Sequence, residues 1–178
     1  MTVVARSICN GLIPVVCIVT WAVSGCGGKE SLMREPVATD ADEDRVAELA
    51  ASWRWKHRLL VVTAESRGAE LDRQWMRVAE VGDKWLDRDL LLILLTSDEG
   101  WIIDDPSAAR SDWSDLSAGE SAAFRHRYDL AGTGFEAVLV GKDGGVKSRY
   151  SKIVDPAMVF PFIDAMPMRM DEIRKESE

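Results

Sequence analysis

The sequence predicts an α/β fold in which a mixed central sheet lies between two layers of helices. Two continuous apolar runs, residues 59–63 and 90–95, have the length and composition of buried strands. A long amphipathic segment between them predicts a crossover helix, and a glycine-rich turn near residue 144 predicts a hairpin. Since a strand of this kind is apolar on both faces, helices are expected on both sides of the sheet.

Two helices are predicted before the second strand. The first lies just ahead of residue 59, and Asp40 or Asp42 is expected to cap it. The second is predicted from Gly68 to Leu86, with Gly82 inside its apolar stripe. A glycine there indicates a close backbone approach to the sheet. The apolar face of the first helix consists of Val46, Leu49, Ala50 and Trp53.

Residues 97–116 form the least regular stretch of the chain. Asp104-Asp105-Pro106 interrupts it, and it contains two isolated tryptophans, Trp101 and Trp113. A loop of about 20 residues is unusual in a small domain, so the stretch is either functional or contains a hairpin. The two tryptophans either form an exposed binding surface or fold back over the core.

The C-terminal half completes the order of elements. Ser117 and Glu120 have capping-box spacing and predict a helix that runs to about Tyr128. The later elements are a strand over 135–140, a turn at 143–145, a return strand over 146–150, and a last helix from Asp155-Pro156 that ends before Pro167.

The resulting order is β-α-β-α-β-β-α. Two strand–helix crossovers, a hairpin and a terminal helix correspond to a thioredoxin-like, three-layer sandwich with a mixed central sheet. The fold prediction is therefore thioredoxin-like within the α/β class.

The N-terminus has the features of a secretion signal. One early charge, Arg6, precedes an apolar run over residues 12–23, which is shorter than the roughly 20 residues that span a bilayer. Val23-Ser24-Gly25-Cys26 then resembles the lipobox of bacterial lipoproteins. The resemblance implies cleavage before Cys26 and acyl chains, palmitate among them, on the new N-terminus. An ordinary secretory signal and an uncleaved anchor are the alternatives.

This processing predicts both the domain organisation and the location. Residues 1–25 are the signal peptide, 26–52 the lipidated cysteine and a polar tether with a short helix, 53–174 the folded domain, and 175–178 a tail. A lipid anchor places the domain in the cell envelope, facing the periplasm or the exterior. The residue after Cys26 is Gly27, whereas an aspartate at this position often retains lipoproteins in the inner membrane. The sequence therefore favours the outer membrane where one exists.

The composition excludes several classes of function. The formal net charge of −8 opposes nucleic-acid binding. All three cysteines, Cys9, Cys17 and Cys26, lie at or before the predicted cleavage site, so the mature domain has no free thiol for a disulfide or for redox chemistry. The chain has only two histidines, and neither a His-Glu-x-x-His motif nor a paired-cysteine motif occurs, so neither a metal nor a cofactor is predicted.

The chain resembles one family over four segments, Trp55–Val62, Asp87–Leu90, Val140–Lys147 and Ile163–Arg169. This family is a domain of unknown function found in bacterial envelope proteins and in animal extracellular-matrix proteins with sushi repeats or coiled coils. The resemblance covers roughly residues 53–174 and implies a thioredoxin- or peroxiredoxin-like fold without an established activity. No catalytic residue can be transferred, and Ala64–Gly68 lacks the cysteine of the redox enzymes.

Candidate binding residues are few. Lys142 and Lys147 flank a glycine turn that either holds an anion or simply closes a hairpin. Arg125-His126-Arg127 is expected to be a solvated helix face. The leading hypothesis is a lipid-anchored, non-catalytic module that binds an envelope protein or polymer, with Trp101 and Trp113 as contact residues. The alternative is an enzyme, a hydrolase or transferase, that uses carboxylates and a histidine.

Overall fold

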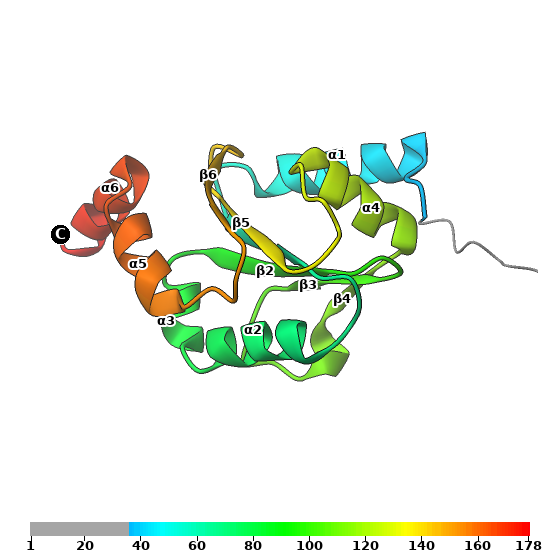
Figure 1. Cartoon of the computed structure of the whole chain (residues 1–178). Helices are drawn as coiled ribbons and strands as arrows, with labels where there is room; N and C mark the ends of the chain where they lie inside the picture. Colours follow the sequence, from blue (N-terminus) through cyan, green and yellow to red (C-terminus); the bar gives the residue numbers. More distant parts are fainter. Residues whose placement is uncertain (1–35) are drawn as a thin grey trace, which may run out of the picture. The chain divides into compact units, whose positions relative to one another are not determined.

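A computed structural model describes residues 36–178, and the predicted α/β class with a mixed central sheet is confirmed (Figure 1). The six strands are ordered β4-β3-β2-β1-β5-β6. The strands are β1 (Arg58–Thr63), β2 (Leu90–Leu95), β3 (Gly100–Ile103), β4 (Ser114–Leu116), β5 (Glu136–Val140) and β6 (Val146–Tyr150). The helices described are α1 (Asp40–Trp53), α2 (Ala69–Ala79), α3 (Gly82–Leu86), α4 (Ala118–Arg127), α5 (Pro156–Asp164) and α6 (Pro167–Glu176).

The sheet has one parallel pair at its centre. β1 runs parallel to β2, with Leu60 opposite Leu92, and antiparallel to β5 on its other side. β3 and β6 then add antiparallel strands outside β2 and β5. All residues of β1 and β2 are buried, which follows from their nearly continuous apolar sequences.

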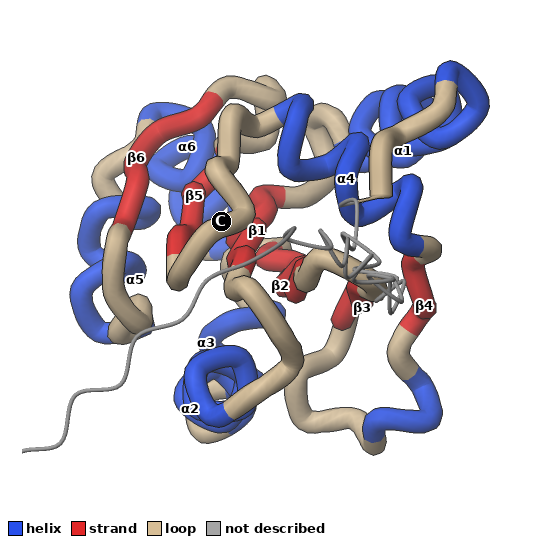
Figure 2. Tube along the Cα trace, turned by 45° about the vertical axis from the view of Figure 1, so that its right-hand side comes forward, coloured by secondary structure: helices blue, strands red, loops and turns tan. Residues whose placement is uncertain are grey.

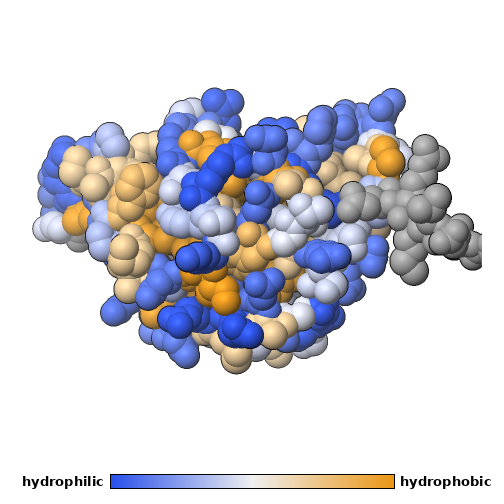
Figure 3. Space-filling view, viewed as in Figure 1, coloured by the Kyte–Doolittle hydropathy of each residue, from blue (hydrophilic) through white to orange (hydrophobic). Residues whose placement is uncertain are grey.

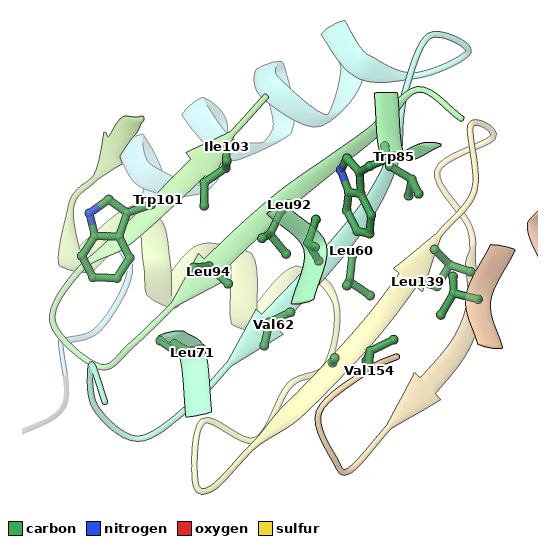
Figure 4. Packing of buried hydrophobic residues seen from close by; sticks show 14 of the residues in the cluster. Leu60, Val62, Leu71, Trp85, Leu92, Leu94, Trp101, Ile103, Leu139 and Val154 are labelled. Atoms are coloured by element: carbon green, nitrogen blue, oxygen red, sulfur yellow. The ribbon is translucent and has the colours of Figure 1, made fainter. Parts of the chain in front are cut away.

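Helices cover both faces of the sheet (Figure 2). Residues such as Leu60, Leu92 and Leu94 point to one face, where they pack against α2, α3 and α5 (Figure 4). Their neighbours Leu59, Val61 and others point to the opposite face, where α1 and α4 cover them. The alternation of side chains along a strand thus divides the core into two layers.

α1 belongs to the same compact unit as the sheet, although the predicted domain begins only at Trp53. Its apolar stripe packs on α4, where the Trp53 and Phe124 rings stack at 6.2 Å. The cap is Thr39 rather than Asp40 or Asp42. The Thr39 hydroxyl accepts from the Asp42 N–H and the Asp42 carboxylate accepts from the Thr39 N–H, so Asp42 is the partner in a capping box.

The segment predicted as one helix from Gly68 to Leu86 is two helices. α2 ends at Ala79, and Val81, with φ −124° and ψ 27°, separates it from α3. Gly82 begins α3, and a Cβ at this position would collide with the Ser107 hydroxyl. The glycine therefore permits close approach of the loop at residue 107, whereas the sequence suggested an approach to the sheet.

The irregular stretch over residues 97–116 contains two strands that the prediction left open as a possible hairpin. β3 and β4 pair antiparallel, with Trp101 opposite Asp115, and a short 3-10 helix at Arg110–Asp112 lies between them. Their shortness and the polar sequence of β4 hide the strand pattern.

The C-terminal half follows the prediction up to α5. α4 has the expected capping box, in which Ser117 and Glu120 exchange hydrogen bonds of 2.8 and 3.1 Å. Asp155 caps α5, and Gly144 has the positive φ (+82°) that the hairpin turn requires. The last predicted helix ends before Pro167, as α5 does, but Pro167 occupies the first turn of a further helix, α6, which was not predicted.

The predicted signal peptide, Cys26 and the predicted tether up to residue 35 lie outside the described residues. Among the helices from residue 36 onward, none combines the length and the apolar character needed to cross a bilayer.

The buried Gln74 side chain provides a test of the fold. Its amide donates to the Val154 carbonyl at 3.0 Å and accepts from the Val154 N–H at 2.6 Å, and thereby ties α2 to the chain before α5. We expect Gln74→Met to lower the free energy of unfolding by about 2 kcal/mol, because both Val154 groups lose their partner. Urea denaturation measures this change. Arg73→Met, at the exposed neighbouring position, should stay within about 0.5 kcal/mol, and an equal loss in both variants would contradict the assignment.

Candidate binding site

Trp101 and Trp113, predicted as possible contact residues, are buried at 7% and 9% exposure. Trp101 lies on β3 among the side chains that face α2 (Figure 4). The Arg67 guanidinium lies over its ring, 4.6 Å from the ring centroid. Trp113 packs edge-on against Trp75 at 5.4 Å. The structure therefore corresponds to the interpretation in which both rings fold back over the core.

The lysines of the hairpin turn are paired with carboxylates. The Lys142 ammonium lies 2.7 Å from both Asp89 and Glu172 and is largely buried. Lys147 lies 2.6 Å from Asp143, and its hydrogen bond is the main cause that lowers the pKa of the Asp143 carboxyl. Both charges are already compensated, so the turn is not arranged to receive a further anion.

Glu172 on α6 is the centre of a cluster of ion pairs. Its carboxylate accepts from Arg58 at 3.2 Å with both oxygens, from Lys142 at 2.7 Å, and lies 3.6 Å from Arg169. Arg58 is the first residue of β1 and is 1% exposed. One carboxylate therefore joins the first strand, the β5–β6 hairpin and the last helix.

A second set of pairs extends this cluster along the α3–β2 connection. Arg88 binds the Asp164 carboxylate with two hydrogen bonds of 2.9 and 2.7 Å, and Arg169 lies 2.6 Å from Asp87. The ion-pair network thus contains four cations and four carboxylates. Its members are Arg58, Asp87, Arg88, Asp89, Lys142, Asp164, Arg169 and Glu172.

The segments that carry the family resemblance supply most of this network. Arg58 belongs to the first segment, Asp87 to Asp89 form the second, Lys142 lies in the third, and Asp164 and Arg169 are in the last. Segments that are distant in sequence therefore meet at one end of the sheet.

An apolar groove of about 330 Å³ lies beside the network. One wall is Phe162, Met166, Pro167 and Met168 from the α5–α6 region, and the other is the β5–β6 turn with the stems of Lys142 and Lys147. Since the lysine ammonium groups are bound to carboxylates, their methylene chains face the groove as apolar surface.

The groove opens onto an exposed apolar surface that α5 and α6 carry (Figure 3). Phe162 is 46% exposed and Met158, one turn earlier on the same helix face, is 75% exposed. We call the groove and these residues the apolar surface. Its remaining exposed members are Met168, Met170 and Ile173.

The two histidines lie in separate depressions. His57 lines a cleft of about 350 Å³ together with Arg54, Arg127 and Tyr128. His126 is on the outside of α4, 3.2 Å from Glu43. Within residues 36–178, no carboxylate forms an ion pair with His57. In the same cleft, burial raises the pKa of the Tyr128 hydroxyl.

Arg125 differs from its expected place. Arg125 was predicted to lie on a solvated helix face, but it is 7% exposed and is buried like Phe124 and Tyr128. No groups of three or more His, Cys, Asp or Glu suited to a metal occur among the described residues.

Comparison with known families gives one match. The family model called "Domain of unknown function (DUF4174)" covers residues 49–172, which is well over half of the chain. The protein therefore belongs to this family. The match includes every residue of the ion-pair network and ends at Glu172, its centre. No solved structure matches the chain.

The network allows a direct test through Glu172. We expect Glu172→Gln to lower the free energy of unfolding by about 3 kcal/mol, because Arg58 and Lys142 are buried and lose a shared counter-charge. Chemical denaturation measures the loss. The matched control is Asp171→Asn, which alters an exposed pair with Arg174 and should change stability by less than about 0.5 kcal/mol. A stability loss for Glu172→Gln no larger than that control would show that the network contributes little.

Proposed function

We propose that this protein is a lipid-anchored, non-catalytic module of the cell envelope that binds another protein through the apolar surface. The observation that carries the proposal is the groove between the β5–β6 turn and α5–α6, which continues into exposed Met158, Phe162 and Met168. Exposed apolar groups that gather at a groove mark interaction sites, whereas scattered ones are ordinary.

The chemistry of the groove favours a protein partner over a polysaccharide. A sugar polymer needs many hydrogen-bonding groups, but the lining of the groove is predominantly apolar and its charged groups are paired with one another. Methionine side chains are flexible and polarizable, so they adapt to the apolar side chains of a helix or an extended segment. The proposed partner therefore presents an apolar segment to α5 and α6.

The fold supports a role without thiol chemistry. Four strands lie side by side in the order β2-β1-β5-β6, with helices between β1 and β2 and before β5, which supports the proposed thioredoxin-like sandwich. The segment after β1, Ala64–Gly68, contains no cysteine, and Arg67 there covers the Trp101 ring. A lipid on Cys26 would also leave the mature chain without a free thiol.

The N-terminal sequence supports membrane anchoring. Thr39, the cap of α1, lies thirteen positions after Cys26. Such a segment reaches at most roughly 45 Å when fully extended. The anchor would therefore hold the domain close to the membrane and leave it free to meet membrane-associated partners.

A second hypothesis, an enzyme that uses His57, has the 350 Å³ cleft in its favour. Arg54, Arg127, Tyr128 and Asp143 line the same cleft. A histidine that acts as a general base is commonly oriented by a partner, and His57 has none among the described side chains. This hypothesis therefore ranks below the binding module.

Lipid anchoring is tested by the substitution Cys26→Ser. We expect this variant to lose incorporation of an alkyne-labelled palmitate and to leave the membrane fraction as a mature protein, because serine lacks the thiol that accepts the diacylglycerol. Cys17→Ser is the matched control, since this cysteine lies within the predicted signal peptide. Labelling of both variants at the wild-type level would refute the anchor.

Binding through the apolar surface is tested by a photo-crosslinking amino acid at Phe162 in the full-length protein in cells. The same probe at Met76, 48% exposed on α2, is the control. We expect an adduct of defined mass at Phe162 alone. The identified partner, once purified, should bind a Phe162→Ala, Met168→Ala variant at least tenfold more weakly, a loss of about 1.4 kcal/mol or more.

Three outcomes would contradict this assignment. They are crosslinks that join only two copies of the chain, adducts only to lipid, and equal affinity of the double variant for the captured partner. The first two would replace the partner protein by a dimer or a membrane surface, and the third would move the interface away from α5 and α6.

A further inference from the structure

Arg125 lies on the inner side of α4. It is one turn beyond Ser121, which is fully buried and donates a hydrogen bond of 2.7 Å to the Thr96 carbonyl. Residues four apart share a helix face, so Arg125 continues this buried line toward the C-terminal end of α4. The adjacent His126 side chain is 79% exposed.

The loop after α4 covers the Arg125 guanidinium. The Leu130 N–H donates to the Arg125 carbonyl at 2.9 Å and turns the chain back over the helix. Gly132 has φ +74°, and a Cβ there would lie 3.1 Å from Arg125 Nη1. Glycine thus permits both the turn and the contact with the guanidinium.

Arg125 has no counter-charge among the residues that the structure describes. Its Nη1 is buried without a hydrogen-bond partner, and no carboxylate of the described residues forms an ion pair with it. Within residues 36–178, the other buried cations each form an ion pair with at least one carboxylate; they are Arg58, Lys142 and Arg169. A guanidinium cannot lose its proton in a protein, so its charge requires compensation from elsewhere.

A pocket of about 400 Å³ gives access to Arg125. Apolar side chains of its lining come from the segment before α1 and the loop after α4, with Val37, Leu130 and Ala131 among them, and they lie beside polar groups of α1 and α4. Glu43 and His126 also line the pocket and are paired with each other at 3.2 Å. The pocket therefore offers one cation without an ion-pair partner in residues 36–178, together with apolar side chains beside it.

We infer that this pocket is a binding site for a small monoanionic carboxylate with an apolar body. The carboxylate pairs with the Arg125 guanidinium, and the apolar body contacts Val37 and Leu130. A phosphate ester carries a second negative charge, which the Glu43 carboxylate in the pocket lining would repel. This site is separate from the apolar surface on α5 and α6.

The inference is tested with 3-phenylpropanoate as the probe, titrated calorimetrically into the full-length protein in a nonionic detergent. We expect saturable binding to one site. The neutral 3-phenylpropanamide and 3-phenylpropyl phosphate should each bind at least tenfold more weakly. Arg125→Gln should weaken binding of the carboxylate at least tenfold, whereas Arg127→Gln, at the exposed position two residues on, should change it less than twofold.

Thermal unfolding without the probe separates a binding role from a structural one. An unpaired buried charge destabilises a fold, so Arg125→Met should melt at a temperature equal to or above that of the wild type while it no longer binds the probe. The inference is overturned by a lower melting temperature of Arg125→Met, by equal binding of the amide, by tighter binding of the phosphate ester, or by no saturable binding of the carboxylate.

Discussion

The burial of β1 on both faces is the constraint on which the other elements depend. All six of its residues are inaccessible, and the parallel neighbour β2 is buried along its whole length as well. A parallel pair requires a crossover, which α2 and α3 provide on one face, and the opposite face must then be covered by other helices. α1 and α4 provide this cover, which explains why α1 is part of the domain and why Trp53 stacks on Phe124.

The same strand begins with a charge, and the ion-pair network follows from that. Arg58 is the first residue of β1 and is 1% exposed, so its guanidinium needs a carboxylate where the strand begins. Glu172 supplies it from α6, and in doing so it fixes the last helix against the β5–β6 hairpin through Lys142. The apolar surface therefore rests on a helix that polar contacts hold in place. This arrangement leaves Met158 and Phe162 exposed, because the apolar contacts of α5 with the core are made by Val159, Phe160 and Ile163 on its other face.

The strands and caps that have a local signal were predictable, but the sites depend on tertiary contacts that leave no local signal. The apolar runs gave β1 and β2, and Ser117 with Glu120 gave the start of α4. β4 is polar and three residues long, and α6 begins with a proline, which can either end one helix or begin another, so neither element had a distinctive pattern. For Trp101 the sequence left open whether the ring is exposed or folds back, and the pairing of β3 with β2 brings it to the core. Arg125 was predicted to be solvated because His126 and Arg127 follow it, and such a run does not reveal which member the following loop will cover.

The two binding regions differ in how the structure compensates charge. Around the apolar surface every buried cation is neutralised within the domain, so a partner there gains by covering apolar groups and needs no charge of its own. Arg125 lies across the sheet from that surface, in the α1–α4 layer, and has no carboxylate partner within residues 36–178. A ligand that supplies this charge is stabilised both by the ion pair and by the removal of an uncompensated buried cation, so a carboxylate whose apolar body contacts Val37 and Leu130 can bind selectively. Since the sheet separates the two regions, occupation of the Arg125 pocket leaves the groove between the hairpin and α5–α6 free for a partner protein.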